Sequence, residues 1–225
     1  MVSRKLMVAW AVLDFLLLVA GVVALALSLT WRAPNLLMNM VLSSADLTVG
    51  TILGIALLIT FAVSICAIVQ RSHVTIGLVI LNYTLLIDAI GIIIIGTFVW
   101  FYTLQERANF HVLWADASRE TRITLQDQLK CCGYFNGTDF AEVGGDFCQT
   151  QDFITGLAAN ISSNFCVAPI TAFADMTLNN AFTTVYGFMA IVLCLLLASL
   201  CVIKKRQEDE RFKRIDAKRG GRGFV

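Results

Sequence analysis

The chain has 225 residues, of which 58% are hydrophobic and only 15% are charged, and its formal net charge is +1. This composition excludes an ordinary soluble domain and indicates a protein that lies in a membrane. The net charge near zero conceals a strong segregation of acidic and basic residues along the chain.

Four segments are apolar enough to span a membrane, because a spanning helix needs about 20 apolar residues to cross about 30 Å of hydrocarbon. We expect these spans at residues 6–29, 47–69, 74–102 and 182–203. An N-terminal signal peptide is the alternative for the first segment, but the apolar run is too long and contains Asp14. The predicted fold is an all-α bundle of four transmembrane helices, with a small, mainly helical, disulfide-stapled domain between helices three and four.

The basic residues predict the orientation of the spans. Residues 1–5 carry two basic residues, and the tail 204–225 carries nine against four acidic ones. The long polar region 103–181 has the opposite balance, with four basic and nine acidic residues. The positive-inside rule therefore places both termini and the turn 70–73 in the cytoplasm. The short loop 30–46 and the long loop 103–181 then face outward.

Two acidic residues, Asp14 and Asp88, lie within the first and third spans, and no Lys or Arg lies within any span to neutralise them. An unpaired charge inside a membrane costs several kcal/mol. We therefore expect protonated side chains that hydrogen-bond to neighbouring helices. A polar lining for a lipid cavity and a path for protons or ions are the alternative interpretations.

Stripes of small residues accompany the two acids. The spacing alternates between three and four at positions 14, 17, 21, 24 and 28 of the first span and at 77, 81, 84, 88, 91, 95 and 98 of the third. Together with Gly50 and Gly54 in the second span, these stripes predict a left-handed bundle of spans one to three, because small residues let helices approach closely in lipid.

The long loop contains four cysteines, namely Cys131, Cys132, Cys148 and Cys166. Disulfides persist on the oxidising outer side of a membrane. A bond between the two adjacent cysteines would strain the chain, so Cys131–Cys166 with Cys132–Cys148, or the crossed pairing, remains. A metal site is not expected, because the whole chain has only two histidines.

Further signals in the long loop concern its surface. Asn136 and Asn160 begin glycosylation sequons, which agrees with an outward-facing loop. Helical spacing of apolar residues between Cys148 and Cys166 predicts a short amphipathic helix or turn. Its apolar face is either the core of the small domain or an exposed patch for protein docking. The residues concerned are 153, 154, 157, 158, 161 and 165.

The cytoplasmic side offers sites for lipids. Cys66 and Cys201 lie near the inner ends of spans two and four and are candidates for palmitoylation. The tail begins with oppositely charged residues four positions apart, which favours a helix, and its positive charge favours anionic lipids. We interpret residues 219–223 as a flexible end and not as an RNA-binding element, so nucleic acid is not an expected partner.

The chain as a whole resembles the tetraspanin family. The resemblance rests on four spans, a small first outer loop, and Cys131-Cys132-Gly133 with Cys148 and Cys166 in the second. It implies the pairing Cys131–Cys166 and Cys132–Cys148. The run 131–140 is most similar to fungal tetraspanins associated with host penetration. Span four departs from the family pattern because it has neither an acidic nor an amide residue, and the Pro-x-x-Cys pattern of the loop is absent.

The resemblance implies a non-enzymatic organiser of the plasma membrane, with endosomal or vacuolar membranes as the other locations. Expected partners are other integral membrane proteins, bound through the long loop and the bundle, and membrane lipids, either sterols or anionic lipids; a homo-oligomer is compatible with this role. No catalytic residue, cofactor or metal is expected. The main alternative is a small transporter or lipid-binding channel that uses Asp14 and Asp88.

Overall fold

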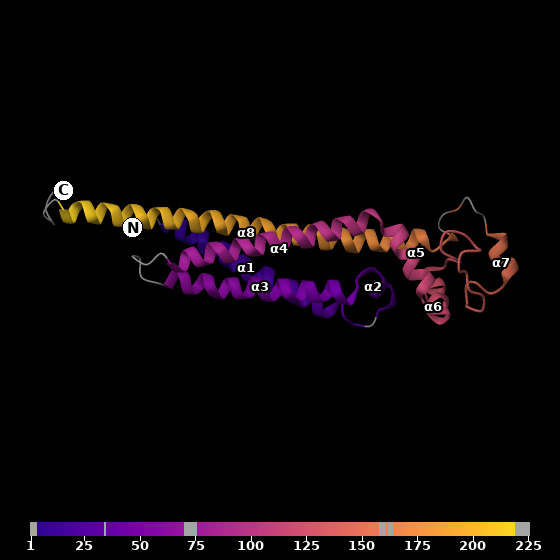
Figure 1. Cartoon of the computed structure of the whole chain (residues 1–225). Coiled ribbons are helices and arrows are strands. Elements are labelled where there is room, and N and C mark those ends of the chain that lie inside the picture. Colours follow the sequence, from indigo (N-terminus) through magenta and orange to yellow (C-terminus); the bar gives the residue numbers. More distant parts are fainter. Residues whose placement is uncertain (1–3, 34, 70–75, 158–160, 162–163, 219–225) are drawn as a thin grey trace. The chain divides into compact units, whose positions relative to one another are not determined.

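The computed structural model describes residues 4–33, 35–69, 76–157, 161 and 164–218. Within these ranges the regular structure is helical throughout, with no strand (Figure 1). The chain divides into two compact units. The first comprises residues 1–29, 48–95 and 185–225, and the second comprises residues 30–47 and 96–184.

Four helices are long and apolar enough to span a membrane, namely α1 (Arg4–Thr30), α3 (Ser44–Val69), α4 (Ile76–Leu104) and α8 (Val167–Lys218). Their number matches the sequence-based prediction, and they indicate a membrane protein. The first three also begin and end close to the predicted limits. The predicted turn 70–73 lies outside the described residues.

The fourth long helix extends beyond the predicted span at both ends. Residues 182–203 are only the middle of α8, which is 52 residues long. Hydropathy marks the part of a helix that suits lipid, whereas backbone hydrogen bonds let the same helix continue through polar sequence at both ends. Its residues 167–184 belong to the second unit and the remainder to the first.

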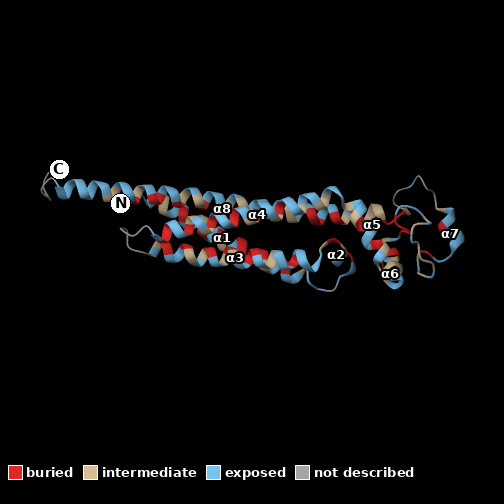
Figure 2. Cartoon of the chain, in the orientation of Figure 1, coloured by how far each residue is buried: buried red, intermediate tan, exposed pale blue. Residues whose placement is uncertain are grey.

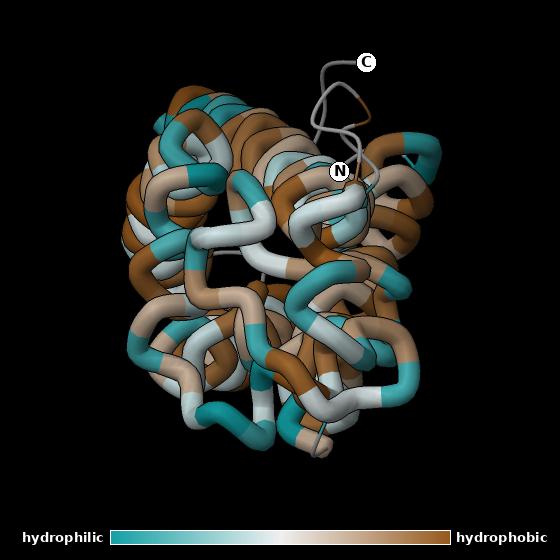
Figure 3. The backbone as a smooth tube through the Cα atoms, turned by 90° about the vertical axis from the view of Figure 1, so that its right-hand side faces the viewer, coloured by the Kyte–Doolittle hydropathy of each residue, from teal (hydrophilic) through white to brown (hydrophobic). Residues whose placement is uncertain are grey.

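In the first unit, small and apolar residues form the buried side of α1. The predicted stripe from Asp14 to Ser28 is buried at every position, as the red segments of Figure 2 illustrate. Other apolar residues of these helices are exposed, among them Val12, Phe15 and Ile59, and long stretches of the backbone have the brown colour of hydrophobic residues in Figure 3. A helix that is hydrophobic all round is typical of a membrane span.

The stripe predicted on α4 is correct only in part. Leu81 and Asp88 are buried, but Phe98 at its C-terminal end is 73% exposed. The residues buried instead include Leu85 and Ile92. A strict seven-residue repeat drifts by about 20° per heptad relative to a straight α-helix, so the predicted stripe turns away from the core.

A close approach of α1 to α3 depends on two glycines. A Cβ atom on Gly54 would lie 2.7 Å from Leu25 Cγ and 3.0 Å from the Leu25 backbone nitrogen. A Cβ on Gly21 would lie 2.9 Å from Leu58 Cδ2. The end of the Leu58 side chain can move away from a methyl group at Gly21, whereas the Leu25 backbone moves less easily, so Gly54 carries the contact that the GxxxG pattern predicts. The handedness of the bundle stays a prediction.

The second unit contains four short helices, α2 (Leu36–Val41), α5 (Glu106–Asp116), α6 (Arg119–Leu129) and α7 (Gln151–Gly156). The side chains of Asn35, Ser118 and Thr150 accept backbone hydrogen bonds at the starts of α2, α6 and α7, as expected of N-cap residues. Leu37 and Val41 of α2 are buried in this unit. The loop 30–46 therefore contributes to a core, which its sequence alone does not indicate.

The predicted amphipathic segment after Cys148 contains the short helix α7. Among the described residues of this segment, Ile154 is buried and Phe153 is exposed. Phe165 is also buried, whereas Ile161 is 47% exposed. Residue 158 lies outside the described residues. The segment thus supplies core residues at two separate points and does not form one continuous apolar face.

Candidate functional site

Two disulfides staple the second unit. Cys131 is bonded to Cys166 and Cys132 to Cys148, closing segments of 35 and 16 residues. This is the pairing that the family resemblance implies. Cys131 and Cys166 lie in the larger core with Trp114, whereas Cys132 and Cys148 lie in a small core of their own. We refer to residues 106–184 as the stapled head.

Gly133 explains why glycine follows the two adjacent cysteines. Its φ of +74° lies in the region that favours glycine. A Cβ atom there would lie 2.1 Å from the Asn136 carbonyl oxygen. The Gly133 carbonyl also accepts a hydrogen bond of 2.9 Å from the Cys166 backbone nitrogen. The motif therefore combines two bridges with a turn that brings the segment after Cys132 back beside Cys166.

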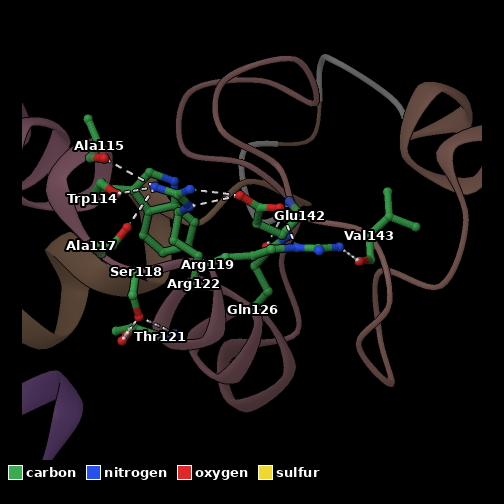
Figure 4. Close-up of polar contacts among 10 residues, drawn as sticks. All are labelled: Trp114, Ala115, Ala117, Ser118, Arg119, Thr121, Arg122, Gln126, Glu142 and Val143. Atoms are coloured by element: carbon green, nitrogen blue, oxygen red, sulfur yellow. Dashed lines mark hydrogen bonds and ion pairs between the residues drawn. The ribbon is translucent and has the colours of Figure 1, made fainter.

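Arg122 joins three segments of the stapled head (Figure 4). Its Nη1 donates hydrogen bonds to the carbonyl oxygens of Trp114, Ala115 and Ala117 at 3.3, 3.1 and 2.8 Å. These carbonyls lie at the end of α5, where helical partners are lacking. Its Nη2 donates to Glu142 Oε1 at 2.7 Å. The arginine therefore caps α5 and anchors the loop after the motif.

Glu142 has two further partners from α6. Arg119 Nε lies 3.2 Å from its second carboxylate oxygen, and its backbone nitrogen donates to Gln126 Oε1 at 3.1 Å. Gln126 is fully buried, and its amide nitrogen lies 3.0 Å from Cys148 Sγ. Sequence reasoning missed Arg122, Gln126 and Glu142, because ordinary polar residues in a loop give no signal of burial before the fold is known.

An aromatic group lies on the surface of the head beside the motif. His111 Nε2 is 3.0 Å from Asp139 Oδ1, and the ring of His111 lies 5.0 Å from that of Phe135 and 6.3 Å from that of Phe140. Phe135 and Phe140 are 46% and 47% exposed. We call His111, Phe135 and Phe140 the aromatic patch. Large exposed apolar groups held in one place are typical of interaction sites.

Phe140 has an unfavourable backbone conformation. Its φ is +51°, a value that is rare for bulky residues other than glycine. Such a conformation costs about 1–3 kcal/mol and occurs most often at functional sites. The ring lies over Arg122, with the guanidinium carbon 5.5 Å from its centre. The fold thus holds a half-exposed phenylalanine where asparagine or glycine would fit with less strain.

The sequon at Asn136 lies next to this patch. Asn136 is exposed, and its Oδ1 accepts hydrogen bonds from the backbone nitrogen and the hydroxyl of Thr138 at 2.9 and 2.7 Å. Its glycosylation stays a prediction. Asn160, the second predicted site, lies outside the described residues.

Asp14 and Asp88, the acids of the two apolar helices α1 and α4, both lie beside hydroxyl groups of α3. Thr60 Oγ1 donates a 2.6 Å hydrogen bond to Asp88 Oδ2, which provides the interhelical contact expected of this acid. Asp14 lies against Ser64, one turn further along α3. Among the described residues, Asp14 Oδ1 and Ser64 Oγ have no hydrogen-bond partner. One helix therefore separates the two acids and contacts both.

A second polar contact joins α4 to α8. Ser199 Oγ donates a hydrogen bond to Asn82 Oδ1. Asn82 lies in an otherwise apolar part of α4, and Ser199 is one of the few polar residues of the segment 182–203. Polar side chains from three spans thus form interhelical contacts within the first unit. Their pairing could not be predicted without the packing of the helices.

The cysteines predicted to carry acyl groups are accessible. Cys66 and Cys201, and also Cys194, have free thiols and are exposed. Acylation of Cys66 and Cys201 stays a prediction. Within the described part of the chain, no group of three or more His, Cys, Asp or Glu residues is arranged to hold a metal ion.

Comparison with family models, with curated proteins and with solved structures finds no match to this chain. The resemblance to tetraspanins therefore rests on the pattern of spans and loop cysteines alone.

Proposed function

We propose that the protein is a non-enzymatic membrane scaffold that binds other integral membrane proteins through its stapled head. The observation that carries this proposal is Phe140, a half-exposed aromatic side chain kept in a strained backbone conformation. A residue retained at a cost to stability, with no need for it in the core, is best explained by a contact outside the chain.

The surroundings of Phe140 support a binding role. The two disulfides and the Arg122 contacts restrict the loop that carries Phe135 and Phe140. A surface that is already ordered loses little conformational entropy on binding. Aromatic residues are also enriched in protein interfaces, where they bury large areas with few rotatable bonds.

The charge of the head suggests the chemistry of its partner. Residues 103–181 contain four basic and nine acidic residues, a net charge of −5. Complementary potentials favour association and orient the two surfaces. We therefore propose an outward-facing domain of another membrane protein, with an apolar patch bordered by Lys or Arg, as the occupant of the aromatic patch.

The remaining parts of the proposal concern the membrane. The bundle keeps the head at the outer surface of the plasma membrane, while acyl groups at Cys66 and Cys201 and the basic tail attract inner-leaflet lipids. Sequence resemblance alone connects such assemblies with polarised growth or host penetration in fungi.

Substitution of Phe140 tests the proposed docking surface. Phe140→Asn retains a residue suited to positive φ, so we expect a melting temperature equal to or above that of the wild type. Capture of partner membrane proteins in mild detergent should fall at least about tenfold, as for an interface residue worth 1.4 kcal/mol or more.

A matched control is available on α7. Phe153 is 42% exposed and packs against Phe147, so Phe153→Asn removes a similar aromatic surface away from the aromatic patch. Partner capture should persist in this variant. Equal capture by wild type and Phe140→Asn, with both chains folded, would contradict the proposal.

The second candidate function is a small transporter or lipid-binding channel. It draws on one observation, the buried Asp14 Oδ1 and Ser64 Oγ that lack partners among the described residues. Flux of protons or lipids in vesicles containing the purified protein, abolished by Asp14→Asn, would favour this function over the scaffold.

A further inference from the structure

Two carboxyl groups meet where α5 packs against α8 within the second unit. Glu106 lies in the first turn of α5, one turn before the buried Phe110, and its carboxyl contacts that of Asp175. Asp175 is exposed, but it follows Ala174, which is buried in the same core as Phe110. Packing of the two helices therefore holds the acids close together.

The Glu106 carboxyl is only partly accessible to water. Its Oε2 atom is shielded from solvent and has no hydrogen-bond partner among the described residues. Glu106 also lines an open hollow together with the other residues of 103–108. A proton can thus reach the pair, although one oxygen is kept away from bulk water.

Few groups near the pair can compensate two negative charges. Asp175 faces Glu106 from α8, the Tyr134 phenol faces it from the loop after the motif, and Arg107 lies beside it on α5. Tyr134 itself donates a 2.8 Å hydrogen bond to the Arg107 carbonyl. Arg107 is exposed and therefore screens the carboxylates only weakly.

These surroundings raise the pKa of Glu106 to about 7. Burial is the largest cause, followed by the charge of Asp175 and the hydrogen bond with it, while Arg107 acts in the opposite direction. Because the folded chain binds this proton more tightly than the unfolded chain, the stabilisation is complete below about pH 4.5. It is lost as the pH rises through about 7.

We propose that Glu106 and Asp175 form a pH-sensitive latch between α5 and α8. At acidic pH the Glu106 carboxyl is protonated and donates a hydrogen bond to Asp175, which holds the start of α5 on α8. When that proton leaves, two carboxylates face one another and the first turn of α5 separates from α8. The head is therefore tightest in an acidic environment and loosens at its base above neutral pH.

The latch also acts on the residue that follows the Cys-Cys-Gly motif. Since the Arg107 carbonyl accepts the Tyr134 hydrogen bond, a displaced first turn of α5 removes a partner from this buried phenol. Tyr134 is fully buried and packs 4.7 Å from the ring of Phe135. Opening of the latch is thus expected to increase mobility beside the aromatic patch.

Hydrogen–deuterium exchange of the full chain in lipid nanodiscs tests the latch. After correction for intrinsic rates, peptides covering residues 103–110 should exchange at least about tenfold faster at pH 8.5 than at pH 5.5, with a midpoint near 7. In Glu106→Gln, the amide donates to Asp175 without titrating, so slow exchange should persist at both pH values.

A second variant keeps the test informative if Glu106→Gln does not fold. Asp175→Asn removes the charge that opposes ionisation of Glu106, and the midpoint should shift downward. Glu120→Gln, which changes an exposed acid in the first turn of α6, should leave the midpoint unchanged. None of these measurements involves a partner, so the latch and the proposed docking function are tested separately.

Three results would overturn the latch. The first is pH-independent exchange of residues 103–110 in the wild type. The second is an unchanged midpoint in both Glu106→Gln and Asp175→Asn. The third is loss of the pH dependence in His111→Gln, which would assign the transition to the contact between His111 and Asp139.

Discussion

In the first unit, helices meet through glycines and a few buried polar pairs, whereas in the second unit two disulfides and an arginine with a mostly covered side chain connect the segments. The difference is the one expected between helices packed in lipid and a small domain in water. In lipid, apolar helices gain little by burying apolar surface against one another, so close packing and hydrogen bonds between them decide association. A small domain in water has too little apolar core to be stable alone and benefits from covalent bridges.

Polar groups also serve the two units differently. In the first unit Thr60 contacts Asp88 and Ser199 contacts Asn82, each as a single pair. In the second unit Arg122 and Glu142 belong to one network that includes backbone carbonyls and Gln126. We infer that loss of one polar pair is tolerated in the bundle, whereas loss of a central residue disorganises the head.

The largest expected effect comes from removing a disulfide. Loop-closure entropy predicts a loss of about 4 kcal/mol for the 35-residue segment of Cys131–Cys166 and about 3 kcal/mol for the 16-residue segment of Cys132–Cys148. Double alanine variants of each pair should be cleaved rapidly by protease between residues 131 and 166. Limited proteolysis with mass spectrometry measures this effect.

Cys194→Ala provides the control, because this cysteine is free and exposed. Protease resistance of the first unit should survive in all three variants. Unchanged protease resistance of the head after loss of Cys131–Cys166 would show that packing alone stabilises it, and the contrast between the two units would disappear.

An intermediate effect is expected at the contact between α1 and α3. Gly54→Ala places a methyl group 3.0 Å from the Leu25 backbone nitrogen, and overpacking of this kind costs about 1–3 kcal/mol. Gly91→Ala is the matched control, since nothing lies within 4 Å of a Cβ at that position. Alanine there should be neutral or stabilising by up to about 1 kcal/mol.

Thermal unfolding in detergent, followed by circular dichroism, distinguishes the two alanine variants. The melting temperature should fall in Gly54→Ala and remain or rise in Gly91→Ala. A similar decrease in both would mean that the α1–α3 contact is not specific to Gly54.

The smallest effect is expected at the polar pair of the bundle. Thr60→Val removes the donor to Asp88 Oδ2, and interhelical hydrogen bonds in membranes are worth about 0.6 kcal/mol on average. Asp88→Asn retains an acceptor oxygen at the same position and should cost less. Urea or detergent titration of the folded fraction measures both.

A loss of several kcal/mol in Thr60→Val would place this pair among the main stabilising contacts and contradict the comparison drawn above. Normal stability of Asp88→Asn combined with complete loss of vesicle flux would instead favour the transporter function.

The sequence by itself determined the number of apolar helices, because length and hydropathy are local properties. The local pattern also indicated that the loop cysteines are bonded, and the requirement for glycine after Cys132 agrees with the positive φ of Gly133. On α1 the spacing of small residues was sufficient to identify the buried face. On α4 the same reasoning failed at Phe98, since a repeat taken from sequence does not include the drift of a real helix.

Only the tertiary structure decided which distant residues meet. Arg122 donates to backbone carbonyls at the end of α5, and Glu106 faces Asp175. Asn82 contacts Ser199, although 117 positions separate them. Each residue type is common in loops or spans, so its sequence neighbours do not reveal its partner. Such contacts depend on how helices pack in space, and for this reason the aromatic patch and the latch could be recognised only in the folded chain.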